Sequence, residues 1–85
     1  MGNCGSDDGR PIVLVFDCIS LGTHEISTMD GLKLKKAVDE LARRLNVPSY
    51  YIKDVLYKYT ILDKYSKIRD LNLPDGAVLN VKFSN

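Results

Sequence analysis

Few side chains of this 85-residue chain are of the types that carry out catalysis or bind metal ions. The only histidine is His24, and the two cysteines are Cys4 and Cys18. A nucleophile needs a base placed beside it, and a zinc site needs three or four clustered ligands. No His, Cys or carboxylate residues of this sequence have a spacing that meets either requirement. We therefore expect no enzyme activity, no metal site and no cofactor.

The first six residues fit the M-G-x-x-x-[ST] pattern of N-myristoylation. Gly2 would carry the acyl chain, and Cys4 is placed for S-palmitoylation, which would supply the second signal that stable membrane anchoring needs. Asp7 and Asp8 would repel an anionic membrane leaflet, which weakens this interpretation. An acylated tail and a chance match to a short pattern both stay open. Residues 1–10 are Gly-rich and polar, and we expect them to form a flexible tail.

The composition is typical of one folded domain, with 45% hydrophobic and 27% charged residues. Twelve Lys and Arg residues stand against 11 acidic residues, so nucleic acid is not expected as the main partner. The longest apolar run, residues 12–16, is far shorter than a membrane span. We therefore expect a cytoplasmic protein that associates with a membrane only if its N-terminus is acylated.

One helix is predicted over residues 32–45, because apolar residues recur there with the spacing of a helical face. These residues are Leu34, Ala37, Val38, Leu41 and Leu45. Asp30 is the expected N-cap. At the other end, Asn46 can adopt the left-handed conformation, and Pro48 prevents the helix from continuing.

The opposite face of this helix is charged. Its basic residues are Lys33, Lys35, Lys36, Arg43 and Arg44. We expect the ion pairs Asp39–Arg43 and Glu40–Arg44 on a solvated face. The alternative is a contact with phosphate groups of a lipid or of RNA.

Strands are predicted near residues 11–16, 24–29, 53–58 and 77–83, from β-branched, aromatic and alternating apolar residues. A short strand near 61–62 and a helical turn at 65–71 are also expected. Pro74 and Gly76 predict a turn before the last strand. The expected order is strand, strand, helix, strand, short strand, turn, strand.

Residues distributed along the chain carry a resemblance to a known family. They are Leu34, Ala37 and Leu41 of the helix, Val47-Pro48 after it, Val55-Leu56-Tyr57, Leu62 with Ile68, residues 70–73, and Leu79 with Val81. In register, with one extra residue before Val55, this pattern resembles ubiquitin over residues 11–83. The resemblance implies an α+β fold of the ubiquitin-like β-grasp type, in which a mixed sheet of four or five strands packs on one helix.

The C-terminal sequence departs from this resemblance. Conjugated ubiquitin-like proteins end in an exposed Gly-Gly, whereas this chain ends Phe83-Ser84-Asn85. The iron–sulfur proteins of this fold need four cysteines, and this chain has two. We therefore expect the non-conjugated type, a monomeric adaptor that binds an unidentified protein. A modifier with a processed or missing C-terminal tail is the alternative.

The resemblance also implies a position for the binding surface. Ubiquitin is recognised through an apolar patch on its sheet, and the matching positions here are Leu56, Asn80 and Lys82. Leu56 keeps the apolar centre, while the other two positions make the patch more polar. Tyr57 and Tyr59 are candidate replacement anchors, because tyrosine is enriched at interfaces.

Overall fold

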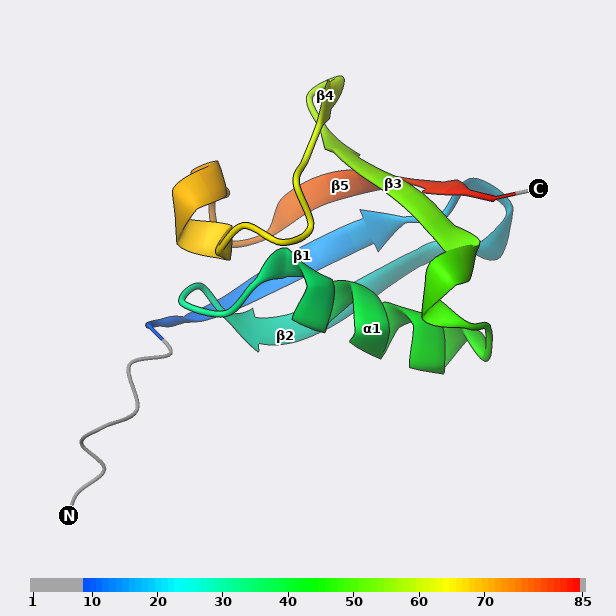
Figure 1. The fold of residues 1–85 in the computed structure, drawn as a ribbon, viewed down its shortest axis with the longest axis horizontal. Coiled ribbons are helices and arrows are strands. Elements are labelled where there is room, and N and C mark those ends of the chain that lie inside the picture. The colour runs from blue at the N-terminus through cyan, green and yellow to red at the C-terminus, as the bar shows by residue number, and fades with distance from the viewer. Residues whose placement is uncertain (1–8, 85) are drawn as a thin grey trace, which may run out of the picture.

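The computed structural model describes residues 9–84 and contains a mixed five-stranded sheet with one α-helix, α1 (Figure 1). The strands are β1 (Pro11–Asp17), β2 (Thr23–Met29), β3 (Ile52–Tyr57), β4 (Thr60–Ile61) and β5 (Ala77–Phe83). The helix α1 spans Leu34–Leu45, and short 3₁₀ helices span Ile19–Leu21 (η1), Ser49–Tyr51 (η2) and Ile68–Leu71 (η3). The order of elements confirms the predicted one, and the fold confirms the predicted α+β class.

The sheet has the strand order β2-β1-β5-β3-β4. The first strand pairs antiparallel with β2 and parallel with β5, and β5 pairs antiparallel with β3. Alternate residues of β1 and β5 are buried on the face that α1 covers, because successive strand residues point to opposite faces (Figure 1). These residues are Ile12, Leu14, Phe16, Ala77, Leu79 and Val81.

The predicted apolar face of α1 is correct: four of its five residues are buried, and the fifth, Leu45, is partly buried and packs against the core. Ala42 completes this face. The predicted N-cap is wrong. The N-cap position is Lys33, and no side chain caps the helix there. The backbone N–H groups of Leu34 and Lys35 instead donate to carbonyl oxygens of the segment 64–66, at 3.0 and 2.8 Å, so these amides need no cap. Asn46 ends the helix in the left-handed conformation, as predicted.

Asp30 instead holds the start of β1. Its carboxylate accepts a hydrogen bond of 2.8 Å from the backbone N–H of Arg10, and its own N–H donates to the carbonyl oxygen of Arg10 at 2.9 Å. Asp30 thus fixes Arg10 directly before β1.

The connection between β3 and β4 is a two-residue turn, in which Tyr57 pairs with Thr60. Both central residues, Lys58 and Tyr59, have positive φ angles of 50° and 68°. Such turns match the twist of the flanking strands, but they favour Asn and Gly, which adopt positive φ at little cost. Lys58 and Tyr59 are thus held in an unfavourable backbone conformation, and the Tyr59 side chain is 95% exposed.

Replacing this pair by Asn-Gly should therefore stabilise the domain. The double variant Lys58→Asn/Tyr59→Gly is expected to raise the free energy of unfolding by about 1 kcal/mol. The midpoint of thermal unfolding, measured by circular dichroism, should rise by roughly 4–8 °C. Loss of the contact between the Lys58 ammonium and the Tyr57 ring, 5.4 Å from its centroid, offsets part of the gain. An unchanged or lower midpoint would show that the turn is not strained.

Candidate protein-binding surface

The sheet face opposite α1 carries Leu56 near its β4 edge. The strand register places Leu56 directly opposite Asn80 on β5 and opposite Ile61 on β4. Side chains of directly opposed residues lie on the same face of a sheet. These three side chains therefore form a row across the outer face.

A hollow of about 440 Å³ opens beside this row. It is lined by Ile19, Leu56, Tyr59, Asn80, Val81 and Lys82. We call Ile19, Leu56, Tyr59, Asn80 and Lys82 the Leu56 surface. The structure thus brings together four of the five residues named from the sequence.

The fifth, Tyr57, lies on the other face of the sheet. It follows Val55 by two residues in β3, and Val55 is fully buried. The Tyr57 ring is partly buried and packs against the core. Tyr57 therefore contributes to folding and not to the Leu56 surface.

Two hydrophobic residues of this region were not identified from the sequence. Ile61 is 62% exposed, and Ile19 in η1 is 80% exposed. Ile19 also has a φ of 50°, although a β-branched residue rarely adopts the left-handed region. A large hydrophobic residue inside a predicted turn segment was the signal available in the sequence.

The residues with reactive side chains have structural environments. Cys18 is fully buried. This burial, and to a smaller extent the nearby Asp17 charge, raises the pKa of its thiol above the usual range. A buried neutral thiol is a poor nucleophile. His24 Nε2 lies 3.0 Å from the carbonyl oxygen of Leu21. Within residues 9–84 no three His, Cys, Asp or Glu side chains are grouped as metal ligands would be.

The charged face of α1 is paired differently from the prediction. Asp39 binds Lys35, at 3.2 Å, and not Arg43. Glu40 lies 3.9 Å from Arg44, as predicted, and 4.0 Å from Arg43. The Arg44 guanidinium also donates to the carbonyl oxygen of Glu25 in β2, at 3.1 Å. Both arginines therefore make contacts at the C-terminal half of α1: each lies near Glu40, and Arg44 also links the helix to β2.

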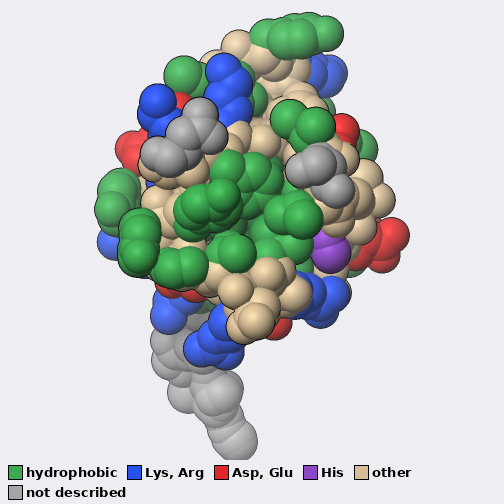
Figure 2. Space-filling model, turned by 90° about the vertical axis from the view of Figure 1, so that its right-hand side faces the viewer, with side chains coloured by type: hydrophobic (Ala, Val, Ile, Leu, Met, Phe, Trp, Pro, Cys, Tyr) green, Lys and Arg blue, Asp and Glu red, His purple; other side chains and the backbone are tan. Residues whose placement is uncertain are grey.

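Hydrophobic side chains also gather on the end of the molecule that carries the turn between β1 and β2, with charged side chains around them (Figure 2). The C-terminal end of β5 lies at the same end of the fold (Figure 1). Phe83 and Tyr51 contribute a ring pair there, with centroids 5.5 Å apart. Tyr51 is 40% exposed.

The two candidate acylation residues, Gly2 and Cys4, lie outside the described residues. Over residues 9–84, none of the helices has the length and hydrophobicity needed to cross a bilayer.

Comparison with solved structures gives 272 similar chains. A protein designed on the basis of ubiquitin aligns with a TM-score of 0.77 and 15% identity, over 88% of this chain and 90% of that one. A chain from a structure described as molecular mimicry of SUMO that promotes DNA repair aligns with a TM-score of 0.78 and 12% identity. This alignment covers 87% of the present chain and 92% of the other. A chain of a pParkin–pUb–UbcH7 complex aligns with a TM-score of 0.76 and 14% identity. This alignment covers 89% of the present chain and 24% of the other.

No protein-family model and no curated protein sequence matches this chain. At 12–15% identity, the structural likenesses extend to the fold alone. The chain has the ubiquitin-like β-grasp fold, of the kind found in ubiquitin and SUMO-like structures.

Proposed function

We propose that this domain is a non-catalytic adaptor that binds another protein through the Leu56 surface. The observation that carries the proposal is the backbone conformation of Ile19 and Tyr59. Both have positive φ angles, 50° and 68°, and both expose large hydrophobic side chains at the hollow. Local strain and hydrophobic exposure both cost free energy, and strained residues cluster at functional sites.

The expected partner segment is a helix or loop with apolar side chains. Leu56 offers an apolar centre, with Ile19 and Tyr59 at the hollow as large anchors. Asn80 and Lys82 are exposed and would supply a polar rim. If Gly2 and Cys4 are acylated, the domain would present this surface at a membrane.

Charged substitutions on the Leu56 surface test the proposal. Leu56→Asp and Ile19→Asp should each lower retention of the partner by roughly tenfold or more, because a charge would be buried in the interface. Retention is measured by affinity capture from an extract of the native cells with quantitative mass spectrometry. An amide NMR spectrum of each variant checks that the domain stays folded.

The matched control is Ser27→Asp, which adds the same charge at an exposed position of β2, the strand at the opposite edge of the sheet. It should retain the same proteins as the wild type. Equal retention by all four proteins would rule out the Leu56 surface as the binding site.

A further inference from the structure

Two segments far apart in the sequence bring lysines together at the start of α1. The backbone holds the segments in place: Lys33 and Lys67 form an antiparallel β-bridge, and the N–H of Lys35 donates to the carbonyl oxygen of Lys64 at 2.8 Å. The fold therefore keeps the backbone positions of these lysines close together.

Two neighbouring hollows of about 400 and 460 Å³ open among these segments. They share Lys35 and Asp39 as lining residues. Their lysines are Lys33, Lys35, Lys36, Lys53, Lys64 and Lys67. Among the described residues 9–84, Asp39 is the single carboxylate that lines either hollow, and no arginine lines them.

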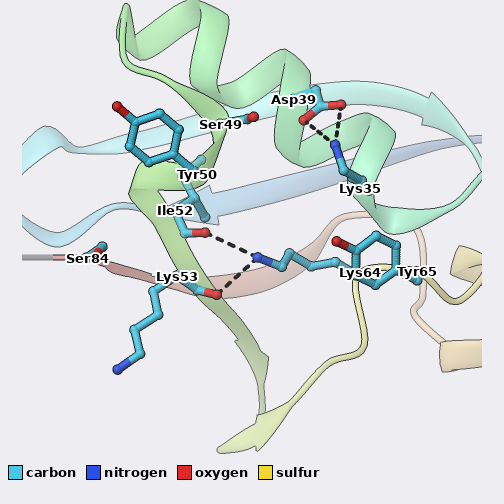
Figure 3. A pocket seen from close by; sticks show the side chains of 9 residues that line it. All are labelled: Lys35, Asp39, Ser49, Tyr50, Ile52, Lys53, Lys64, Tyr65 and Ser84. Atoms are coloured by element: carbon cyan, nitrogen blue, oxygen red, sulfur yellow. Dashed lines mark hydrogen bonds and ion pairs between the residues drawn. The ribbon is translucent and has the colours of Figure 1, made fainter.

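Figure 3 shows how the side chains of the first hollow are arranged. The Lys64 ammonium donates to the carbonyl oxygens of Ile52 and Lys53, at 3.2 and 3.0 Å. Neutral carbonyls leave its charge uncompensated, and an ammonium has a third N–H group to donate. The rings of Tyr50 and Tyr65 lie on opposite sides of this ammonium (Figure 3).

The local charge contrasts with that of the whole chain. The chain as a whole has a formal net charge of +1, whereas six lysines and one aspartate are among the described residues that line the two hollows. Asp39 already pairs with Lys35 at 3.2 Å, and the Lys53 side chain points away from Lys64 (Figure 3). The positive charge that a ligand would meet therefore comes mainly from the other four lysines, Lys33, Lys36, Lys64 and Lys67. Like charges held together repel each other, and a bound anion relieves that repulsion. Arginine pairs bidentately with both carboxylate and phosphate, whereas lysine binds as a point charge without that planar fork. A cluster of such point charges suits phosphate groups, because each phosphate concentrates up to about two negative charges on three oxygens.

We propose that these two hollows form one binding site for a compact ligand that carries several phosphate groups. Such a ligand can be a soluble polyphosphate or the headgroup of a phosphoinositide lipid. This site consists of different residues from those of the Leu56 surface, and the two can be tested separately.

The first experiment is an amide NMR titration with inorganic tripolyphosphate in metal-free buffer at constant ionic strength. Saturable shifts are expected in residues 33–36 and 64–67, and citrate, a carboxylate polyanion, should bind more weakly. The variant Lys33→Gln/Lys67→Gln should weaken binding roughly tenfold. Both residues are exposed, and neither side chain has a hydrogen bond to another of the described residues, so the variant should fold.

The matched control is Arg43→Gln/Lys58→Gln, which removes two positive charges outside the hollows and should change the affinity by less than about threefold. Leu56→Asp should bind tripolyphosphate like the wild type. Non-saturable shifts, equal weakening by both double variants, or equal affinity for citrate would overturn the proposal.

Sedimentation with vesicles identifies the source of the phosphate groups. Phosphatidylcholine vesicles are compared with and without phosphatidylinositol bisphosphate. If the domain binds only the vesicles that contain phosphatidylinositol bisphosphate, and this binding depends on the lysines, the ligand is a lipid headgroup. If it binds neither kind of vesicle but binds tripolyphosphate saturably, the ligand is a soluble polyphosphate. Tight binding of an RNA oligonucleotide with no saturable tripolyphosphate binding would replace the proposal by a polynucleotide surface.

Discussion

Replacing Phe16 by alanine is expected to lower the free energy of unfolding by about 3–5 kcal/mol. Phe16 is 0% exposed, and within residues 9–84 it has the largest volume of the fully buried side chains. It lies in β1, opposite His24 of β2 and Leu79 of β5, so the cavity would open at the centre of the sheet. Small domains have only about 5–15 kcal/mol of total stability, and the variant should be close to unfolding.

Chemical denaturation followed by circular dichroism measures this loss. Val15→Ala is the matched control, because Val15 is the neighbouring residue on the outer face and is only partly buried. It should cost about 1 kcal/mol or less. Similar losses for the two variants would mean that the core is not centred on Phe16.

Replacing Lys64 by methionine should have the second largest effect, a loss of about 2 kcal/mol. Only the last residues of β3 pair with β4, so the outer edge of its first half has no neighbouring strand within residues 9–84. The Lys64 ammonium donates to the carbonyl oxygens of Ile52 and Lys53 along this edge, and methionine would leave both without that donor. Unpaired strand edges also promote association.

Thermal unfolding measures the stability, and analytical ultracentrifugation measures association. Lys53→Met is the control, because Lys53 is exposed and its side chain has no hydrogen bond to any residue of the described range 9–84. Its stability should change by less than about 0.5 kcal/mol. Wild-type stability of Lys64→Met would show that solvent satisfies these carbonyls equally well.

Local periodicity predicted much of the fold. The spacing of Leu34, Ala37, Val38 and Leu41 defines a helical face, and such a pattern depends only on neighbours in the sequence. The turn at Asn46 was also predictable, because its left-handed conformation follows from residue type. The same alternation that marks strands would have placed Tyr57 on the same, buried face of the sheet as Val55.

The features that were missed depend on contacts between distant segments. Asp30 is a good N-cap by residue type, but the helix amides find partners in the segment 64–66, which no local pattern reveals. The Lys64 ammonium binds the carbonyl oxygens of Ile52 and Lys53 in β3, which lie 12 and 11 residues earlier in the sequence. Ile19 lies in a turn that has no periodic pattern, so only the folded structure reveals that it lies beside Leu56.

The direction of β1 has a practical consequence for how this protein can be attached to a surface or label. The chain enters β1 at Arg10, beside Asp30, and reaches Ile19 only after the seven residues of the strand. At about 3.3 Å per strand residue, an N-terminal tag would join the domain roughly 20 Å from the Leu56 surface. A C-terminal tag would begin shortly after Lys82, which belongs to that surface, and would compete with a bound partner for space. Immobilisation through the N-terminus is therefore the orientation that leaves the Leu56 surface accessible.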